Sequence, residues 1–176
     1  MIRALVILAV VAVAAVLLYA ASRPDTFRVE RVASIRAPAD ELHALIADLH
    51  RFNTWNPYEK KDPNLKGRYR GADSGLGAAY DFEGNQDVGK GSLEIVESTP
   101  PTRVAMKLDM VAPFEAHNLV EFTLVPRGDA TEVTWAMRGP SPFVARLLGV
   151  FMNMDAMIGR DFEAGLANLK TVAERS

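Results

Sequence analysis

The sequence predicts an α+β fold in which a curved antiparallel β-sheet wraps around a long C-terminal helix, preceded by a transmembrane helix. Three observations predict it. An uncharged apolar run opens the chain, six β-rich runs separated by turn residues fill its middle, and a long apolar stripe of helical period closes it. The 176 residues, 49% of them hydrophobic, suffice for one globular domain with its own core.

The first element is the uncharged run from Ala4 to Ala21, 18 residues long. As a helix it measures about 27 Å, close to the thickness of a bilayer core. It has no polar stripe, which argues against a buried helix of a soluble protein. We interpret residues 1–22 as an uncleaved single-pass anchor, because signal-peptide apolar regions usually run about 7–15 residues. A cleaved signal peptide is the alternative.

Two signals bear on which side of the membrane the domain lies, and they oppose each other. Arg3 is the one basic side chain before the apolar run, whereas four arginines follow it up to Arg36, and that count favours a cytoplasmic domain. The very short tail before the run is typical of an exported protein. We expect the exported side, with residues 23–26 as a linker and residues 27–176 as the domain.

The domain is expected to begin with a strand and a short helix. Phe27, Val29, Ala33 and Ile35 share one side of a strand that Arg31 interrupts. The following segment, "APADELHALIADLHRF", spaces its leucines and isoleucine as an amphipathic helix does, with Pro38 at its start.

The next stretch, "FNTWNPYEKKDP", is predicted to be a loop, because the Asn56-Pro57 pair disfavours helix. A loop tryptophan either seals the core beneath it or lines the mouth of a pocket, and both interpretations of Trp55 stay open. Tyr58 and the charged residues after it are expected to be solvated.

Residues 65–138 contain six runs of alternating or β-rich residues, separated by Gly, Pro and Asp clusters. One side of each run is apolar and the other is charged, which predicts an antiparallel meander with one dry face. The clearest inward positions are Val104, Met106, Leu108, Met110, Val120, Phe122, Leu124, Val133, Trp135 and Met137.

The chain is predicted to close with one long helix, capped by Ser141 with Pro142 at its first position. Its apolar stripe would lie on the dry face of the sheet. The stripe consists of Phe143, Leu147, Phe151, Met154, Ile158, Phe162, Leu166 and Leu169.

Several classes of function lack their signals. A net charge of −2 with scattered signs gives no nucleic-acid footprint, and the absence of Cys excludes thiolate chemistry. The segment "GNQDVGKGS" has P-loop glycines, but Gly91 takes the Ser/Thr position and a strand follows instead of a helix. His43, His50 and His117 form no metal-binding pattern. We therefore expect no metal and no cofactor, and we favour a function without catalysis over an enzymatic one.

The order of elements, with "APADELHALIADLHRFNTWNPY", "TEVTWAMRGP" and "MDAMIGRDFEAGLANLK", resembles the polyketide cyclase/dehydrase and lipid-transport family of the START-like (SRPBCC) superfamily. The resemblance covers about residues 27–174. It implies the helix-grip fold, in which the sheet and the long helix enclose a deep apolar cavity. It also implies that Trp55-Asn56-Pro57 packs at one end of that cavity.

The expected ligand-binding residues are those that strand and helix periodicity turn towards this cavity, together with Trp55, which the resemblance implies at its end. They are Trp55, Tyr69, Tyr80, Met106, Leu108, Phe122, Trp135, Met154 and Ile158. This set contains no carboxylate, His or Lys, and it suits an apolar ligand. We expect membrane-tethered binding or transfer of a lipid or another hydrophobic small molecule. A cyclase or dehydratase acting on a hydrophobic substrate and a non-catalytic envelope interaction protein are the alternatives.

Overall fold

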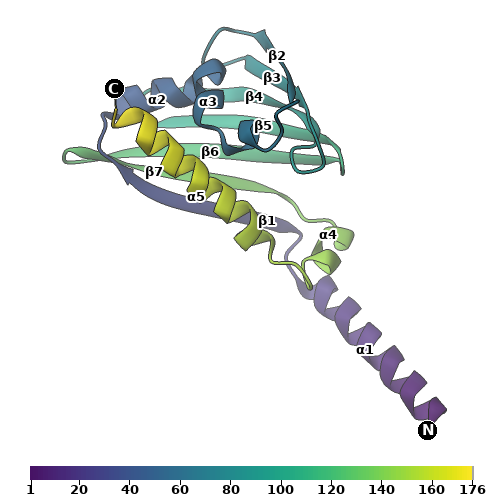
Figure 1. The fold of residues 1–176 in the computed structure, drawn as a ribbon. Coiled ribbons are helices and arrows are strands. Elements are labelled where there is room, and N and C mark those ends of the chain that lie inside the picture. Colours follow the sequence, from purple (N-terminus) through teal and green to yellow (C-terminus); the bar gives the residue numbers. More distant parts are fainter. Residues whose placement is uncertain (176) are drawn as a thin grey trace.

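The computed structural model describes residues 1–175, which form an α+β domain with a projecting N-terminal helix (Figure 1). In chain order the elements are α1 (Ile2–Ser22), β1 (Thr26–Ile35), α2 (Ala39–Ala47), α3 (Leu49–Trp55), the 3-10 helix η1 (Pro57–Lys60), β2 (Lys66–Gly71), β3 (Ala78–Glu83), β4 (Lys90–Thr99), β5 (Arg103–Ala112), β6 (Ala116–Arg127), β7 (Ala130–Pro140), α4 (Phe143–Leu148) and α5 (Met154–Ala173).

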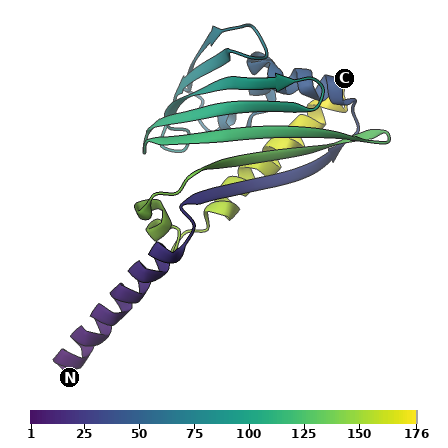
Figure 2. The same cartoon turned by 180° about the vertical axis from the view of Figure 1, so that it is seen from behind.

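The sheet confirms the predicted meander. Its seven strands are antiparallel in the order β1-β7-β6-β5-β4-β3-β2, so the first strand pairs with the last. The sheet curves, and α2, α3 and α5 lie on its concave side (Figures 1 and 2). The side chains predicted to point inward do so, since Val104, Met106 and Phe122 are each 0% exposed. The opposite face carries ion pairs, among them Glu121 with Arg103 and Arg138.

The predicted first helix is two helices. The chain turns at Asp48, whose carboxylate accepts hydrogen bonds from the backbone N–H groups of His50 (2.9 Å) and Arg51 (3.2 Å) and so starts α3. Phe52 and Trp55 consequently lie on a helix, and their prediction as loop residues was wrong. The helix does end before Pro57, as the Asn-Pro pair predicted.

The predicted single C-terminal helix is also wrong. The helix is interrupted between Leu148 and Met154. Asn153 caps the second helix, because its side-chain oxygen accepts a hydrogen bond from the Ala156 N–H at 3.0 Å. Pro142, not Ser141, occupies the cap position of α4. The later half of the stripe, from Phe162 to Leu169, is buried on the sheet as expected. The earlier half is not, because α4 packs beside α1 instead of the sheet.

The helix α1 is long and apolar enough to span a membrane, a property that it shares with signal sequences. Only 6% of its most apolar window is buried in the domain, so it is not a core helix of the described structure. Figures 1 and 2 show it projecting away from the sheet.

Candidate functional site

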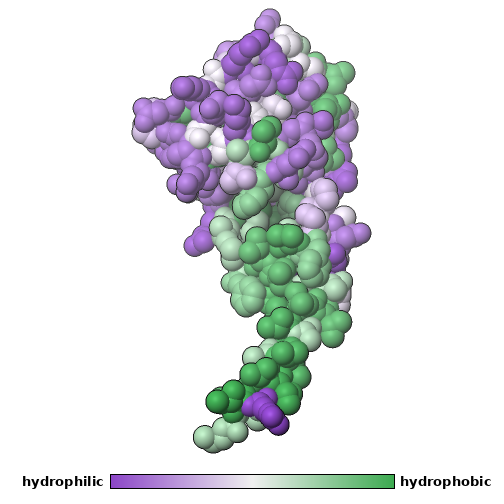
Figure 3. All heavy atoms as spheres, turned by 90° about the vertical axis from the view of Figure 1, so that its right-hand side faces the viewer, coloured by the Kyte–Doolittle hydropathy of each residue, from purple (hydrophilic) through white to green (hydrophobic). Residues whose placement is uncertain are grey.

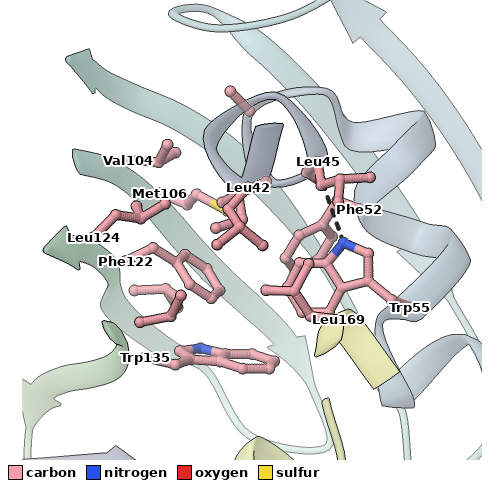
Figure 4. Close-up of a cluster of buried hydrophobic side chains, with 14 of the residues drawn as sticks. Leu42, Leu45, Phe52, Trp55, Val104, Met106, Phe122, Leu124, Trp135 and Leu169 are labelled. Atoms are coloured by element: carbon pink, nitrogen blue, oxygen red, sulfur yellow. Dashed lines mark hydrogen bonds between the residues drawn. The ribbon is translucent and has the colours of Figure 1, made fainter. Parts of the chain in front are cut away.

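The concave face of the sheet has two unlike parts, and the first is a cluster of aromatic rings beneath α3 and α5 (Figure 4). We name this cluster the closed end. It consists of Phe52, Trp55, Phe122, Trp135 and Phe162, which are at most 3% exposed. Trp135 stacks on Phe162 with 4.3 Å between ring centroids, and Phe122 lies 5.0 Å from Trp135. The rings fill the space between the helices and the sheet here.

Trp55 is an internal plug of the closed end. Its side chain is 0% exposed, and its indole N–H donates to the Leu45 carbonyl at 3.1 Å (Figure 4). Its ring meets Phe52, Phe122 and Trp135 edge-on. Both its apolar body and its polar atom are therefore satisfied within the protein, as in the core-sealing interpretation of this residue.

Trp135 differs from Trp55 in its polar atom. Its indole N–H is buried and has no hydrogen-bond partner among residues 1–175. The side-chain oxygen of Asn118, on the same face of neighbouring strand β6, is likewise buried without a partner in that range. A buried donor or acceptor without a partner is costly and calls for an explanation. The concave face thus offers one free donor and one free acceptor.

The second part of the concave face lies towards α1, and we name it the open end. It consists of the half-buried residues Phe27, Phe82, Leu108, Asn118 and Ile158. The burial of inward side chains changes between one inward position and the next along a strand. Leu108 and Phe27 are half-buried, whereas Met106 and Val29, two residues further in, are 0% and 3% exposed. The open end therefore presents apolar side chains that the domain itself covers only in part.

Two of the predicted site residues lie apart from the others. Tyr69 is 39% exposed on the outermost strand, where it stacks on His50 with 3.7 Å between ring centroids. Met154 is 47% exposed in the first turn of α5, because the break before it carries the chain away from the sheet. The structure brings together Trp55, Tyr80, Met106, Phe122 and Trp135, with Leu108 and Ile158 at the open end.

A carboxylate lies beside one residue of the expected lining. The Tyr80 hydroxyl donates to the Glu59 carboxylate at 2.9 Å. Burial raises the pKa of Glu59 above its ordinary value, against the smaller lowering effect of this hydrogen bond. Burial also raises the pKa of the Tyr80 hydroxyl, and the neighbouring carboxylate raises it further. Charge and hydropathy patterns carry no signal for this pair, because Glu59 meets Tyr80 from the 3-10 helix η1, in a segment that was expected to be solvated.

Arg31 is a second inward polar residue, and here the sequence did carry a signal. It interrupts the apolar side of β1 and reaches α5, where its guanidinium bonds the carboxylates of Asp155 (3.0 Å) and Glu163 (2.7 Å). Gly159 makes this approach possible, because a methyl group there would overlap the guanidinium. Arg31 thus ties the sheet edge to the first half of α5.

Two surface pockets lie elsewhere, beside α2 and α3. One, of about 110 Å³, includes His50 and Tyr69 in its wall, and the other, of about 370 Å³, includes His43 and Ser98. Neither is lined by Phe122 or Trp135. They hold no part of the apolar surface described above.

Solved structures share this fold at low sequence identity. A protein from Chromobacterium violaceum superposes with a TM-score of 0.59 at 15% identity, over 86% of this chain and 99% of its own. The major latex-like protein 151 of Panax ginseng gives 0.61 at 12% identity, over 85% and 99%. Aha1 of Colwellia psychrerythraea gives 0.59 at 12%, over 84% and 96%. These likenesses confirm the helix-grip fold.

A search among curated proteins gives no match. The family model described as "Polyketide cyclase / dehydrase and lipid transport" matches residues 26–174, the whole domain after α1. This match covers far more than half of the chain and agrees with the sheet, the helices and the low-identity structural likenesses. The chain therefore belongs to the polyketide cyclase/dehydrase and lipid transport family.

Proposed function

We propose that the protein binds a lipid or another hydrophobic small molecule on its concave face and transfers it while α1 holds the domain at a membrane on the exported side. The observation that carries this proposal is the presence of two polar atoms without a partner among residues 1–175, the Trp135 N–H and the Asn118 oxygen, among the mainly apolar side chains of the concave face. Apolar walls with a few fixed polar groups are typical of small-molecule sites.

The open end is the entry that this proposal requires. Its half-buried side chains lie at the α1 side of the sheet, and the apolar part of a ligand would complete their burial. The closed end would set the depth limit, because its rings already fill the space there. The family description includes lipid transport, which agrees with this use of the surface.

A tether adds to binding by raising local concentration. If α1 spans the bilayer, the site is confined within a few nanometres of the lipid surface, and capture becomes effectively intramolecular. This tether is part of the proposal, and it rests on the length and apolarity of α1.

Native mass spectrometry of the full chain, released from detergent micelles after purification from its host, tests the binding. We expect one apolar molecule to remain bound at collision energies that strip micelle lipid. Trp135→Phe should lower its occupancy about tenfold, because one hydrogen bond of about 1.4 kcal/mol is lost. Trp55→Phe is the matched control, since the Trp55 N–H is already engaged by Leu45.

Because α1 is unchanged in both variants, lipid held by α1 alone would be lost from neither. Equal occupancy in the wild type and both variants would therefore contradict the proposed site. An empty wild-type protein, even after incubation with a lipid mixture, would favour the envelope interaction protein.

A cyclase or dehydratase is the second candidate, and the Glu59–Tyr80 pair favours it. A half-buried carboxyl group with a raised pKa beside a phenol can hold a proton for general acid catalysis. Turnover of a polyketide-like aromatic precursor that disappears in Glu59→Gln while the bound apolar molecule is retained would support this reaction. Unchanged turnover in that variant would remove Glu59 from the chemistry.

A further inference from the structure

An exposed apolar surface surrounds the break between α4 and α5. Large apolar side chains follow one another here without burial, with Phe151 76% and Val144 67% exposed. We name this set the α4 surface. It consists of Phe143, Val144, Leu148, Phe151, Met154 and Met157. Contiguous exposed apolar patches of this kind mark interaction sites with proteins or membranes.

The α4 surface is fixed to the end of α1 by hydrogen bonds. The Arg23 guanidinium donates to the Gly149 carbonyl at 2.7 Å. The Arg146 guanidinium donates to the carbonyls of Ala21 (3.2 Å) and Arg23 (2.9 Å). These bonds join the C-terminal end of α1, including its cap residue Arg23, to the last turn of α4 and to Gly149 directly after it. The position of the α4 surface is therefore set relative to α1.

This position places the surface at a bilayer boundary. A 21-residue helix measures about 31 Å, which matches a hydrocarbon core of about 30 Å. With α1 in the bilayer, its last turn lies at the interface, and α4 lies beside that turn. Figure 3 shows hydrophobic side chains continuing from α1 onto the adjoining part of the domain. The more hydrophilic surface begins further from α1.

We propose that the α4 surface contacts the interfacial layer of the phospholipid bilayer that α1 spans. This inference rests on the membrane tether of the proposed function. Interfacial segments bury their apolar face about 5–10 Å into the boundary between headgroups and acyl chains. Arg23 and Arg146, at the same level, suit the phosphate layer. The contact turns the open end of the concave face towards the bilayer.

The α4 surface is continuous with the apolar surface of α1, and this continuity favours a bilayer over another protein as its occupant. The patch does not stand alone on the domain but extends the apolar surface of α1, which is long and apolar enough to span a membrane and which the proposed function places in the bilayer. A partner protein would have to meet both surfaces at once.

Depth-dependent fluorescence quenching tests this contact. The chain has no Cys, so single substitutions accept an environment-sensitive NBD label at one chosen place. We would label Phe151→Cys on the α4 surface, Val10→Cys within α1, and Leu76→Cys in the β2–β3 loop, which is 67% exposed. The full chain is reconstituted in phosphatidylcholine–phosphatidylglycerol vesicles that carry nitroxides at a shallow or a deep acyl position.

We expect shallow nitroxides to quench the Phe151 label at least twofold and deep nitroxides to quench the Val10 label, with Leu76 unaffected. A Phe151 label that behaves like Leu76 while Val10 is quenched would overturn the docking surface and leave the tether intact. An unquenched Val10 label would overturn both. Shielding of Phe151 from aqueous iodide without nitroxide quenching would assign the surface to a protein contact instead. Val144→Cys repeats the test should Phe151→Cys disturb the fold.

Discussion

The closed end and the open end of the concave face use the same kinds of side chain for opposite purposes. At the closed end, rings contact rings and Trp55 satisfies its own polar atom, so the apolar packing is complete and the Trp135 N–H is the polar atom left without a partner among residues 1–175. At the open end, apolar groups are half-covered and the Asn118 side-chain oxygen has no partner in the same range. The difference teaches that one continuous inner face can hold both a stabilising core and a surface left for another molecule.

The largest test of this contrast truncates one phenylalanine at each end. Phe122→Ala should cost about 3–5 kcal/mol, because it leaves a cavity among packed rings. In a domain of this size that loss lowers Tm by roughly 10 °C. Phe27→Ala should cost less than half as much, since Phe27 is already half-exposed. Tryptophan fluorescence of the full chain follows both transitions, because both tryptophans lie at the closed end. Equal decreases in Tm for the two variants would contradict the distinction between the closed end and the open end.

The two tryptophans allow a finer comparison. Trp55→Phe and Trp135→Phe remove the same atoms, but among residues 1–175 Trp55 has a hydrogen-bond acceptor and Trp135 has none. Trp55→Phe should therefore be the more destabilising by about 1–3 kcal/mol, because the Leu45 carbonyl is left buried without a donor. Thermal unfolding followed by circular dichroism measures the difference. A costlier Trp135→Phe would show that its N–H is satisfied within the folded protein.

Gly159 tests how the open end is held together. Gly159→Ala places a methyl group where the Arg31 guanidinium lies and should displace the end of this flexible side chain, so it should cost no more than the loss of the Arg31 ion pairs, offset in part by the higher helix propensity of Ala. Arg31→Ser removes the same ion pairs and should also lower the Tm only slightly, because these pairs are partly exposed. In the double variant the methyl group has room, so the two losses should not add. Additive losses in Tm would show that Arg31 is not what Gly159 accommodates.

The smallest expected effect is the pH dependence from Glu59. Its pKa is raised in the folded protein, so the protonated form favours folding, and this contribution is lost as pH rises through the folded pKa. Glu59→Gln keeps an acceptor for the Tyr80 hydroxyl but does not titrate. The Tm of the wild type relative to this variant should therefore rise between about pH 7 and about pH 5. A Tm difference that does not change with pH would contradict the burial of the carboxyl group.

Local periodicity predicted the parts of the molecule whose burial depends on one strand or one helix turn. The inward positions of Met106, Phe122 and Trp135 follow from alternation alone, and the family resemblance supplied the overall arrangement. The break before Met154 could not be predicted in this way. The apolar spacing continues through Gly149, and the chain turns because α4 packs on a helix more than 120 residues earlier in sequence, as the Arg23–Gly149 separation of 126 shows.

The candidate site shows the same limit. Tyr80 was placed correctly, but its partner Glu59 follows from the geometry of a single 3-10 turn, which charge and hydropathy do not encode. For Trp55 the sequence left core packing and pocket lining as alternatives, and its helix was not predicted because the Asp48 cap restarts helical structure within a segment rich in Asn and Pro. Local hydrogen bonds of this kind determine where a helix starts and where an individual side chain lies. Periodicity determines only which face of a helix or strand a residue occupies.

The short connection between α1 and β1 sets the reach of the domain. Only Arg23, Pro24 and Asp25 separate the two elements, which allows at most about 10 Å of extended chain. Arg23 is in addition bonded to the Gly149 carbonyl, which shortens the free length further. Under the proposed function, a carrier built in this way would serve the leaflet on which it stands. Delivery to an opposing membrane would require a second, mobile protein to collect the cargo from it.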